Sequence, residues 1–204
     1  MKSILCLLFS LMTLTSIYSQ VGLGLTSGID IYQRYSNADS IAYGSAGSLL
    51  ANVFVGPKIW VGGDKVSLSL EAQANIGLLG LAVKDYKGLG MVAFPIIGRL
   101  NFQGLSGLDK EGKMGFSIGG GIQYNKTELY YLSNSFEDRG VDRSFFRTYI
   151  VETAVGFGMS GFSGAVYLRY GYDPNSTANS FNLGLQFDFN IPKLKSITDP
   201  ASEL

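Results

Sequence analysis

The chain contains no histidine and a single cysteine, Cys6, which lies among the first twenty residues. Without histidine the protein has no Ser-His-Asp triad, no Cys-His pair and no histidine-ligated zinc site. We expect Cys6 to be removed with an N-terminal leader, which leaves the mature chain without a disulfide or a thiolate metal site. We therefore predict no catalytic residue, no cofactor and no metal, and expect that the protein is not an enzyme.

Charged residues are also scarce, at 16% of the chain, and the two signs cancel. No basic stripe suggests nucleic acid as a partner, and no charged run suggests a disordered tail. The mean hydropathy is above zero, yet the longest apolar runs after the leader, 76–83 and 91–98, are interrupted by Gly or Pro. A membrane-spanning helix needs roughly 20 apolar residues, so the apolar content must lie in shorter segments.

Residues 1–19 have the pattern of a secretory signal peptide. Lys2 precedes an apolar run, and the small residues Ser16 and Ser19 precede a cleavage site before Gln20. An N-terminal membrane anchor is the alternative, but the run is too short to span a bilayer. We expect an exported protein with one domain over residues 20–191 and a short periplasmic tail at 192–204.

Residues 180–191 carry the clearest local pattern, in which apolar and polar residues alternate without a miss. A period of two predicts a strand whose faces meet different solvents. Pro192 has no N–H to donate and should end the pairing. Similar alternation occurs in seven earlier segments, at about 21–34, 51–61, 66–76, 90–103, 116–125, 148–157 and 162–172. In the fourth of these, Pro95 and Ile97 fall on the polar face, where a bulge would shift the register.

Eight strands of this length match a closed outer-membrane barrel. Long connections follow the first, third, fifth and seventh strands, and short ones follow most of the others, as expected for external loops and periplasmic turns. Outward aromatic residues form two belts, with Phe102, Phe116, Phe157, Phe162 and Phe189 at one end and Tyr124, Tyr149, Tyr170, Tyr172 and Phe181 at the other. We predict an all-β, eight-stranded antiparallel up-and-down transmembrane β-barrel in the outer membrane of a Gram-negative bacterium.

A soluble barrel of the lipocalin kind is the alternative fold, with the same alternation turned inside out. Its outer face would need many Lys, Glu and Asp residues. The polar face consists instead mostly of Gly, Ser, Asn, Gln, Thr and Ala. These small side chains suit a narrow lumen and favour the membrane barrel.

Seven charged residues fall on the polar face: Asp30, Lys58, Glu71, Arg99, Glu152, Arg169 and Asp188. An unpaired charge in a poorly hydrated lumen is costly. We therefore expect a structural ion-pair network that fills the lumen and leaves no open pore, since eight strands enclose room only for side chains. The alternative is a selectivity filter or a proton path.

The longest predicted external loop, 126–144, combines aromatic and arginine side chains, which are typical of recognition surfaces. The candidate recognition residues are Tyr130, Tyr131, Phe136, Arg139 and Arg143. The alternative is a hairpin that extends beyond the membrane, with residues 129–132 in its ladder.

Short motifs resemble a known family. The leader end Tyr18-Ser19-Gln20, the stretch Phe94-Pro95-Ile96-Ile97 and the glycine run 119–121 resemble the small outer-membrane β-barrel proteins common in Bacteroidota, including those labelled PorT-like. The resemblance covers residues 21–191. It implies a lipid bilayer with lipopolysaccharide and the outer-membrane insertion machinery as partners, and a protein partner in an envelope complex.

The same resemblance implies two further features. Asp39-Ser40-Ile41 looks like the O-glycosylation sequon of that phylum. Barrels of this type often end on an aromatic residue that the insertion machinery reads, whereas here a tail follows, so we expect Phe187 and Phe189 to supply that signal internally.

We expect a structural or surface-interaction role that is exerted through the external loops. The first alternative is an accessory subunit of a larger envelope complex, in protein secretion if the PorT-like resemblance holds. A small solute channel is the second alternative. The third is a lipid-acting enzyme, whose acid-base residues would have to be other than histidine.

Overall fold

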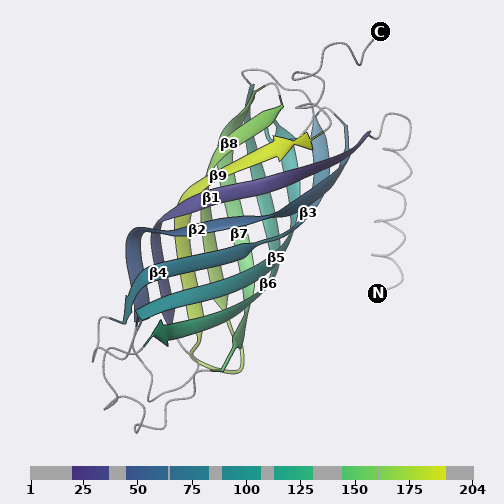
Figure 1. Ribbon diagram of the computed structural model, residues 1–204. Helices are drawn as coiled ribbons and strands as arrows, with labels where there is room; N and C mark the ends of the chain where they lie inside the picture. The colour runs from purple at the N-terminus through teal and green to yellow at the C-terminus, as the bar shows by residue number, and fades with distance from the viewer. Residues whose placement is uncertain are drawn as a thin grey trace, which may run out of the picture.

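The alternating segments form strands of one antiparallel sheet in the computed structural model, which describes residues 20–36, 45–63, 65–82, 89–106, 113–130, 144–159 and 161–191. The strands are β1 (Gln20–Ser36), β2 (Ser45–Gly62), β3 (Val66–Ala72), β4 (Ala74–Ala82), β5 (Leu89–Gln103), β6 (Lys113–Tyr130), β7 (Phe146–Met159), β8 (Phe162–Tyr172) and β9 (Asn179–Asn190). β1 pairs with both β2 and β9, so the sheet closes into a barrel whose strands run obliquely around a common axis (Figure 1).

β3 and β4 are two segments of a single strand. Both pair with β2 and with β5, and the register is the same on either side of Gln73, from Glu71↔Ile97 to Asn75↔Ala93. The backbone N–H of Gln73 donates to the Pro95 carbonyl at 2.9 Å, but Pro95 has no N–H to return. The interruption is therefore a missing hydrogen bond, and the prediction of eight antiparallel strands in a closed barrel is confirmed.

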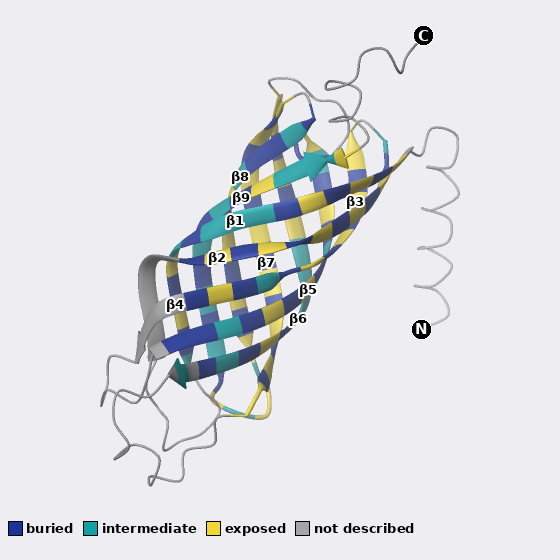
Figure 2. Cartoon of the chain, viewed as in Figure 1, coloured by how far each residue is buried: buried dark blue, intermediate teal, exposed yellow. Residues whose placement is uncertain are grey.

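Buried and exposed residues alternate along the strands (Figure 2), and most of the buried residues are polar, whereas the large exposed ones are apolar. β7 is an example, because buried and exposed residues alternate along all of it. Val151 and Val155 are each 56% exposed on the outside, whereas Glu152 between them is 2% exposed. The described residues form no helix that is long and apolar enough to cross a membrane.

The fourth predicted strand keeps its predicted faces. β5 pairs with β6 in one register from Met91 to Gln103, and Pro95 and Ile97 are buried in the lumen. The irregularity lies at the strand's start, where Gly90 adopts φ 81°, a value that glycine tolerates without strain.

The alternation of residues 21–34 predicts that Ile31 faces outward with Ile29, but the alternation slips at this residue. Opposite β9, Asp30 pairs with Gly184 and Tyr32 with the adjacent Leu183, so Ile31 is the extra residue of a bulge. Tyr32 takes the exposed face, and Tyr35 enters the lumen, where it is completely buried. A bulge changes the phase of alternation. In β1, even-numbered residues face the lumen before residue 31 and the outside after it.

The turn after β5 folds into the barrel rather than away from it. Gln103 has a left-handed backbone, at φ 51°, and Ser106 N donates to the Gln103 carbonyl at 2.8 Å. Leu105 is 6% exposed and packs in one cluster with Phe54, Ala154 and Tyr167. This connection was predicted as a periplasmic turn that is longer than the other two, and its first residues lie inside the end of the lumen.

Strands are longer than predicted at the opposite end. β2 begins at Ser45, and β6 continues to Tyr130, which pairs with Leu89 of β5. The β6–β7 ladder ends at Asn125↔Phe146, so this extension joins β6 to β5. The signal peptide 1–19, the tripeptide 39–41 and the tail 192–204 lie outside the described residues.

Candidate functional site

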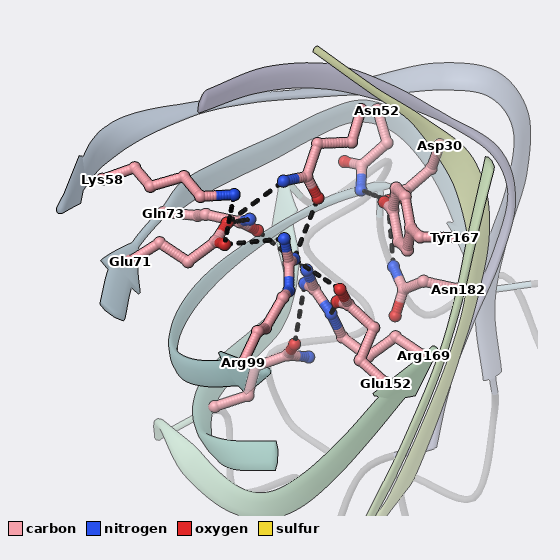
Figure 3. A network of polar contacts seen from close by, with 12 residues as sticks. Asp30, Asn52, Lys58, Glu71, Gln73, Arg99, Glu152, Tyr167, Arg169 and Asn182 are labelled. Atoms are coloured by element: carbon pink, nitrogen blue, oxygen red, sulfur yellow. Dashed lines mark hydrogen bonds and ion pairs between the residues drawn. The ribbon is translucent and has the colours of Figure 1, made fainter. Parts of the chain in front are cut away.

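A chain of ion pairs crosses the lumen, with Arg99 of β5 at its centre (Figure 3). Arg99 Nη1 lies 2.6 Å from Glu71 Oε1 on β3, and Nη2 pairs with Glu152 Oε1 on β7. All three side chains are almost completely buried. One guanidinium thus joins carboxylates from two sides of the barrel.

Glu152 also binds a second guanidinium, that of Arg169. The two residues lie directly opposite each other on β7 and β8, and Arg169 Nε donates to Glu152 Oε2 at 2.7 Å. Arg169 Nη2 donates to Gln73 Oε1 at 2.9 Å, and Nη1 to Gln123 Oε1 at 3.4 Å. Charge-assisted bonds to several acceptors hold the planar Arg169 group in one orientation.

Lys58 extends the chain of ion pairs toward the short-turn end. Its Nζ lies 2.7 Å from Asp188 Oδ2 and 3.5 Å from Glu71 Oε1. Gln186 fills the space between these groups: its Nε2 donates to Asp188 Oδ1 at 2.8 Å, and its Oε1 accepts from Arg99 at 2.9 Å. The neutral side-chain amide of Gln186 thus bonds both to the Asp188 carboxylate and to the Arg99 guanidinium.

Asp30 belongs to a separate cluster. Its carboxylate accepts hydrogen bonds from the Tyr167 hydroxyl and from the side-chain amides of Asn52 and Asn182. Asn182 Nδ2 also contacts the Tyr35 hydroxyl at 2.7 Å. The structure thus joins six of the seven predicted charged residues by direct contacts and holds the seventh with neutral donors.

A glycine in β6 makes the crossing from Arg99 to Glu152 sterically feasible. Gly119 pairs with Arg99 on one side and with Glu152 on the other. A Cβ placed on Gly119 would lie 2.5 Å from Arg99 Cγ and 2.6 Å from the Gly98 carbonyl. Gly119, the first residue of the run 119–121, therefore lies under the stem of the Arg99 side chain.

The ion-pair network is balanced, because it joins three cations, Lys58, Arg99 and Arg169, to three carboxylates, and Asp30 lies outside it in its own cluster. Its contacts are mutual and multiple, which suits rigid packing better than the passage of ions. Sequence reasoning missed the linking amides and Tyr35. The amides were visible as polar residues of the alternation, whereas the bulge at Ile31 concealed Tyr35.

The predicted recognition residues lie at or beyond the limit of what the structure describes. The backbone of Tyr130 ends β6, and Tyr131, Phe136, Arg139 and Arg143 lie outside the described residues. Within the described ranges, no cluster of carboxylates, cysteines or histidines could hold a metal ion.

The fold and the lumen together define a closed eight-stranded β-barrel whose interior is lined with buried charged and polar side chains. No protein-family model matches the chain, and no curated protein matches it. Among solved structures, Neisserial surface protein A is 13% identical, with a TM-score of 0.49 over 84% of this chain and 98% of that one. The N-terminal β-barrel domain of Pseudomonas aeruginosa OprF is 13% identical, with a TM-score of 0.45 over 83% of this chain and 100% of that one.

A third match is the attachment invasion locus protein of Yersinia pestis, solved in complex with the heparin analogue sucrose octasulfate. It is 10% identical, with a TM-score of 0.42 over 83% of this chain and 99% of that one. Such low identity carries no information about activity or partners. The fold assignment rests on the pairing of β1 with β9.

Removing one ion of the network should destabilise the barrel. In Arg169→Leu the Glu152 carboxylate loses its second guanidinium, and we expect the free energy of unfolding to fall by about 3–5 kcal/mol. The double variant Glu152→Leu/Arg169→Leu should lose less than the sum of the single variants, because neither charge is left alone. Urea unfolding followed by circular dichroism measures both, with the outward Leu168→Met as control; additive losses would contradict the coupling.

Two glycines on adjacent strands give a matched pair of substitutions. Gly119→Ala should cost about 1–3 kcal/mol of unfolding free energy, because the new Cβ displaces Arg99. Gly98→Ala places a Cβ on the outer face with no atom nearer than 4.0 Å, so it should be neutral or slightly stabilising. Equal effects of the two substitutions in urea titrations would show that Arg99 does not depend on the glycine.

Proposed function

We propose that the protein is an integral outer-membrane β-barrel, exported through a cleaved signal peptide, which presents its loops at the cell surface. The observation that carries the proposal is the inverted distribution of side chains. Large apolar residues are exposed around the whole barrel, including Val21 at 73%, Val151 at 56% and Phe116 at 50%. A water-exposed protein rarely leaves so continuous an apolar surface, whereas a membrane barrel requires it.

Aromatic contacts at the two ends of the barrel support the same proposal. Near the short turns, Phe102 stacks on Phe116 with ring centroids 4.4 Å apart, and Phe162 lies 6.3 Å from Phe189. At the other end, Tyr149 lies 6.4 Å from Tyr172. Two such girdles separated by aliphatic residues are typical of barrels anchored at both membrane interfaces.

The filled lumen supports a structural or surface-interaction role rather than transport. The ion pairs of Arg99, the Asp30 cluster and the inward turn at Leu105 occupy the interior at successive levels. We propose that the barrel is a non-conducting and non-enzymatic scaffold. Its partners are then the bilayer with its lipopolysaccharide, the insertion machinery and whatever binds the loops.

The second candidate is a subunit of a larger envelope complex, which would fit the resemblance to PorT-like proteins of Bacteroidota. The extension of β5 and β6 past the β6–β7 ladder, where Leu89 pairs with Tyr130, favours it, because it offers ordered backbone beyond the girdle. Affinity capture from detergent extracts separates the two candidates. One stoichiometric protein partner favours the subunit, and recovery of the barrel alone favours an autonomous surface protein.

The membrane location can be tested by fractionation and gel migration. We expect the protein in the outer-membrane fraction, and we expect its band to shift on boiling, because a closed barrel resists detergent until it is heated. A protein in the soluble fraction whose migration does not change on boiling would refute the proposal.

The absence of a conducting pore can be tested in planar bilayers. The reconstituted protein should add no conductance above that of a protein-free bilayer, because paired side chains fill the lumen. A porin serves as the positive control. Reproducible single-channel steps from the purified protein would show that the lumen conducts.

A further inference from the structure

Two cations lie on the outer face of the barrel at its loop end, on the adjacent strands β6 and β7. Lys126 of β6 stands between the inward-facing Asn125 and Thr127, and Arg147 of β7 is exposed next to the buried Thr148. Tyr124 pairs with Arg147 across the ladder, which brings the two strands' outward residues together. Both cations therefore point away from the ion pairs of the lumen.

Each of these cations lies over an aromatic ring of β7 or of the residue that precedes it. Lys126 Nζ lies 5.7 Å from the centroid of the Phe145 ring, and Arg147 Cζ lies 5.0 Å from that of Tyr149. Phe145 in turn packs on Phe94 of β5, at 6.0 Å. Cations over ring faces in this arrangement are attracted by the ring quadrupole.

The position of these residues indicates which part of a bilayer they would contact. If the barrel spans the membrane as proposed above, the outer face of this girdle contacts lipid, and the cations lie where apolar chains give way to headgroups. Phosphate groups concentrate at this level, and each Lys or Arg near an anionic lipid surface strengthens binding. A guanidinium also binds phosphate oxygens in a bidentate manner.

Among the described side chains, the acid Asp173 interacts with Arg147. The hydrogen bonds from Ser176 and from Asn175 N lower the pKa of Asp173 most, and the positive charge of Arg147 lowers it further. Asp173 accepts the bond from Ser176 at 2.6 Å and the one from Asn175 N at 3.1 Å. Its oxygens are thus engaged within their own turn, which leaves the Arg147 guanidinium over Tyr149.

We propose that Lys126 and Arg147, together with Phe145 and Tyr149, form a binding site for the phosphorylated headgroup of an outer-leaflet lipid. The cations bind the phosphate oxygens, and the rings contact the apolar part of the same lipid. This inference rests on the proposed membrane location and adds to it a ligand chemistry and four named residues. It also gives a role to two cations that stand beside aromatic rings on a largely apolar wall.

The test compares lipid binding by the full-length barrel folded in zwitterionic micelles. Native mass spectrometry during titration with lipid A gives the dissociation constant, and the same lipid without its phosphates is the comparison ligand. The double variant Lys126→Gln/Arg147→Gln should bind lipid A about 30-fold more weakly, and each single variant about fivefold more weakly. Binding of the dephosphorylated lipid should not change.

Arg34→Gln is the matched control, because Arg34 is also exposed at the loop end but on β1, which β8 and β9 separate from β7. It should leave the affinity unchanged, and Lys126→Arg should retain most of it. Inorganic phosphate at the lipid concentration should not compete, because the rings need the lipid's apolar part.

The outcomes separate this inference from the proposed function. Equal affinity in the wild type and the double variant, or an equal loss in Arg34→Gln, would overturn the headgroup site. If the protein band still shifts on boiling, the proposed membrane barrel is retained although the headgroup site is rejected. If the wild type neither folds in micelles nor shifts on boiling, the proposed membrane location fails first.

Discussion

Arg99 is held between two carboxylates in an interior that is only eight strands wide, and much of the structure follows from the need to keep that charge paired. A guanidinium without its partners would be prohibitively costly in such a space. Glu71 and Glu152 therefore approach from opposite sides. Gly119 has no side chain, which leaves room for that of Arg99. Gln186 Oε1 accepts a further hydrogen bond from Arg99 Nη2.

The same requirement separates the two faces of every strand. Because ions and amides take up much of the inside, most of the large apolar side chains lie on the outside, and the barrel acquires an apolar surface that is poorly suited to water. The backbone N–H and C=O groups at the edges of the sheet also need partners. Closure supplies them, because β1 pairs with β9. A closed sheet is the only β-structure whose backbone is fully paired within hydrocarbon.

The sequence predicted the strands, their number and most of their faces, because a period of two is a local property. It did not predict where the period slips. Ile31 looks like any other apolar residue of its strand, and its bulge depends on how β1 fits between β2 and β9. The interruption at Gln73 likewise arises from Pro95, a residue on a different strand.

The composition of the lumen was more predictable than its contacts. Alternation shows which residues face inward, but the stagger of the strands decides which of them share a level. For that reason Asp30 was expected in the ion-pair network and lies instead among Tyr167, Asn52 and Asn182. The candidate recognition residues beyond Tyr130 lie outside the described residues, and their role remains a prediction.

The inward turn at Leu105 gives the barrel two unlike ends. At the same end the indole of Trp60 lies over Gly22, and the Trp60 side chain is 2% exposed. Leu105 and Trp60 thus place an aliphatic and an aromatic side chain in the interior at the short-turn end. The lining there is less polar than the middle of the lumen, where Arg99 pairs with Glu71 and Glu152.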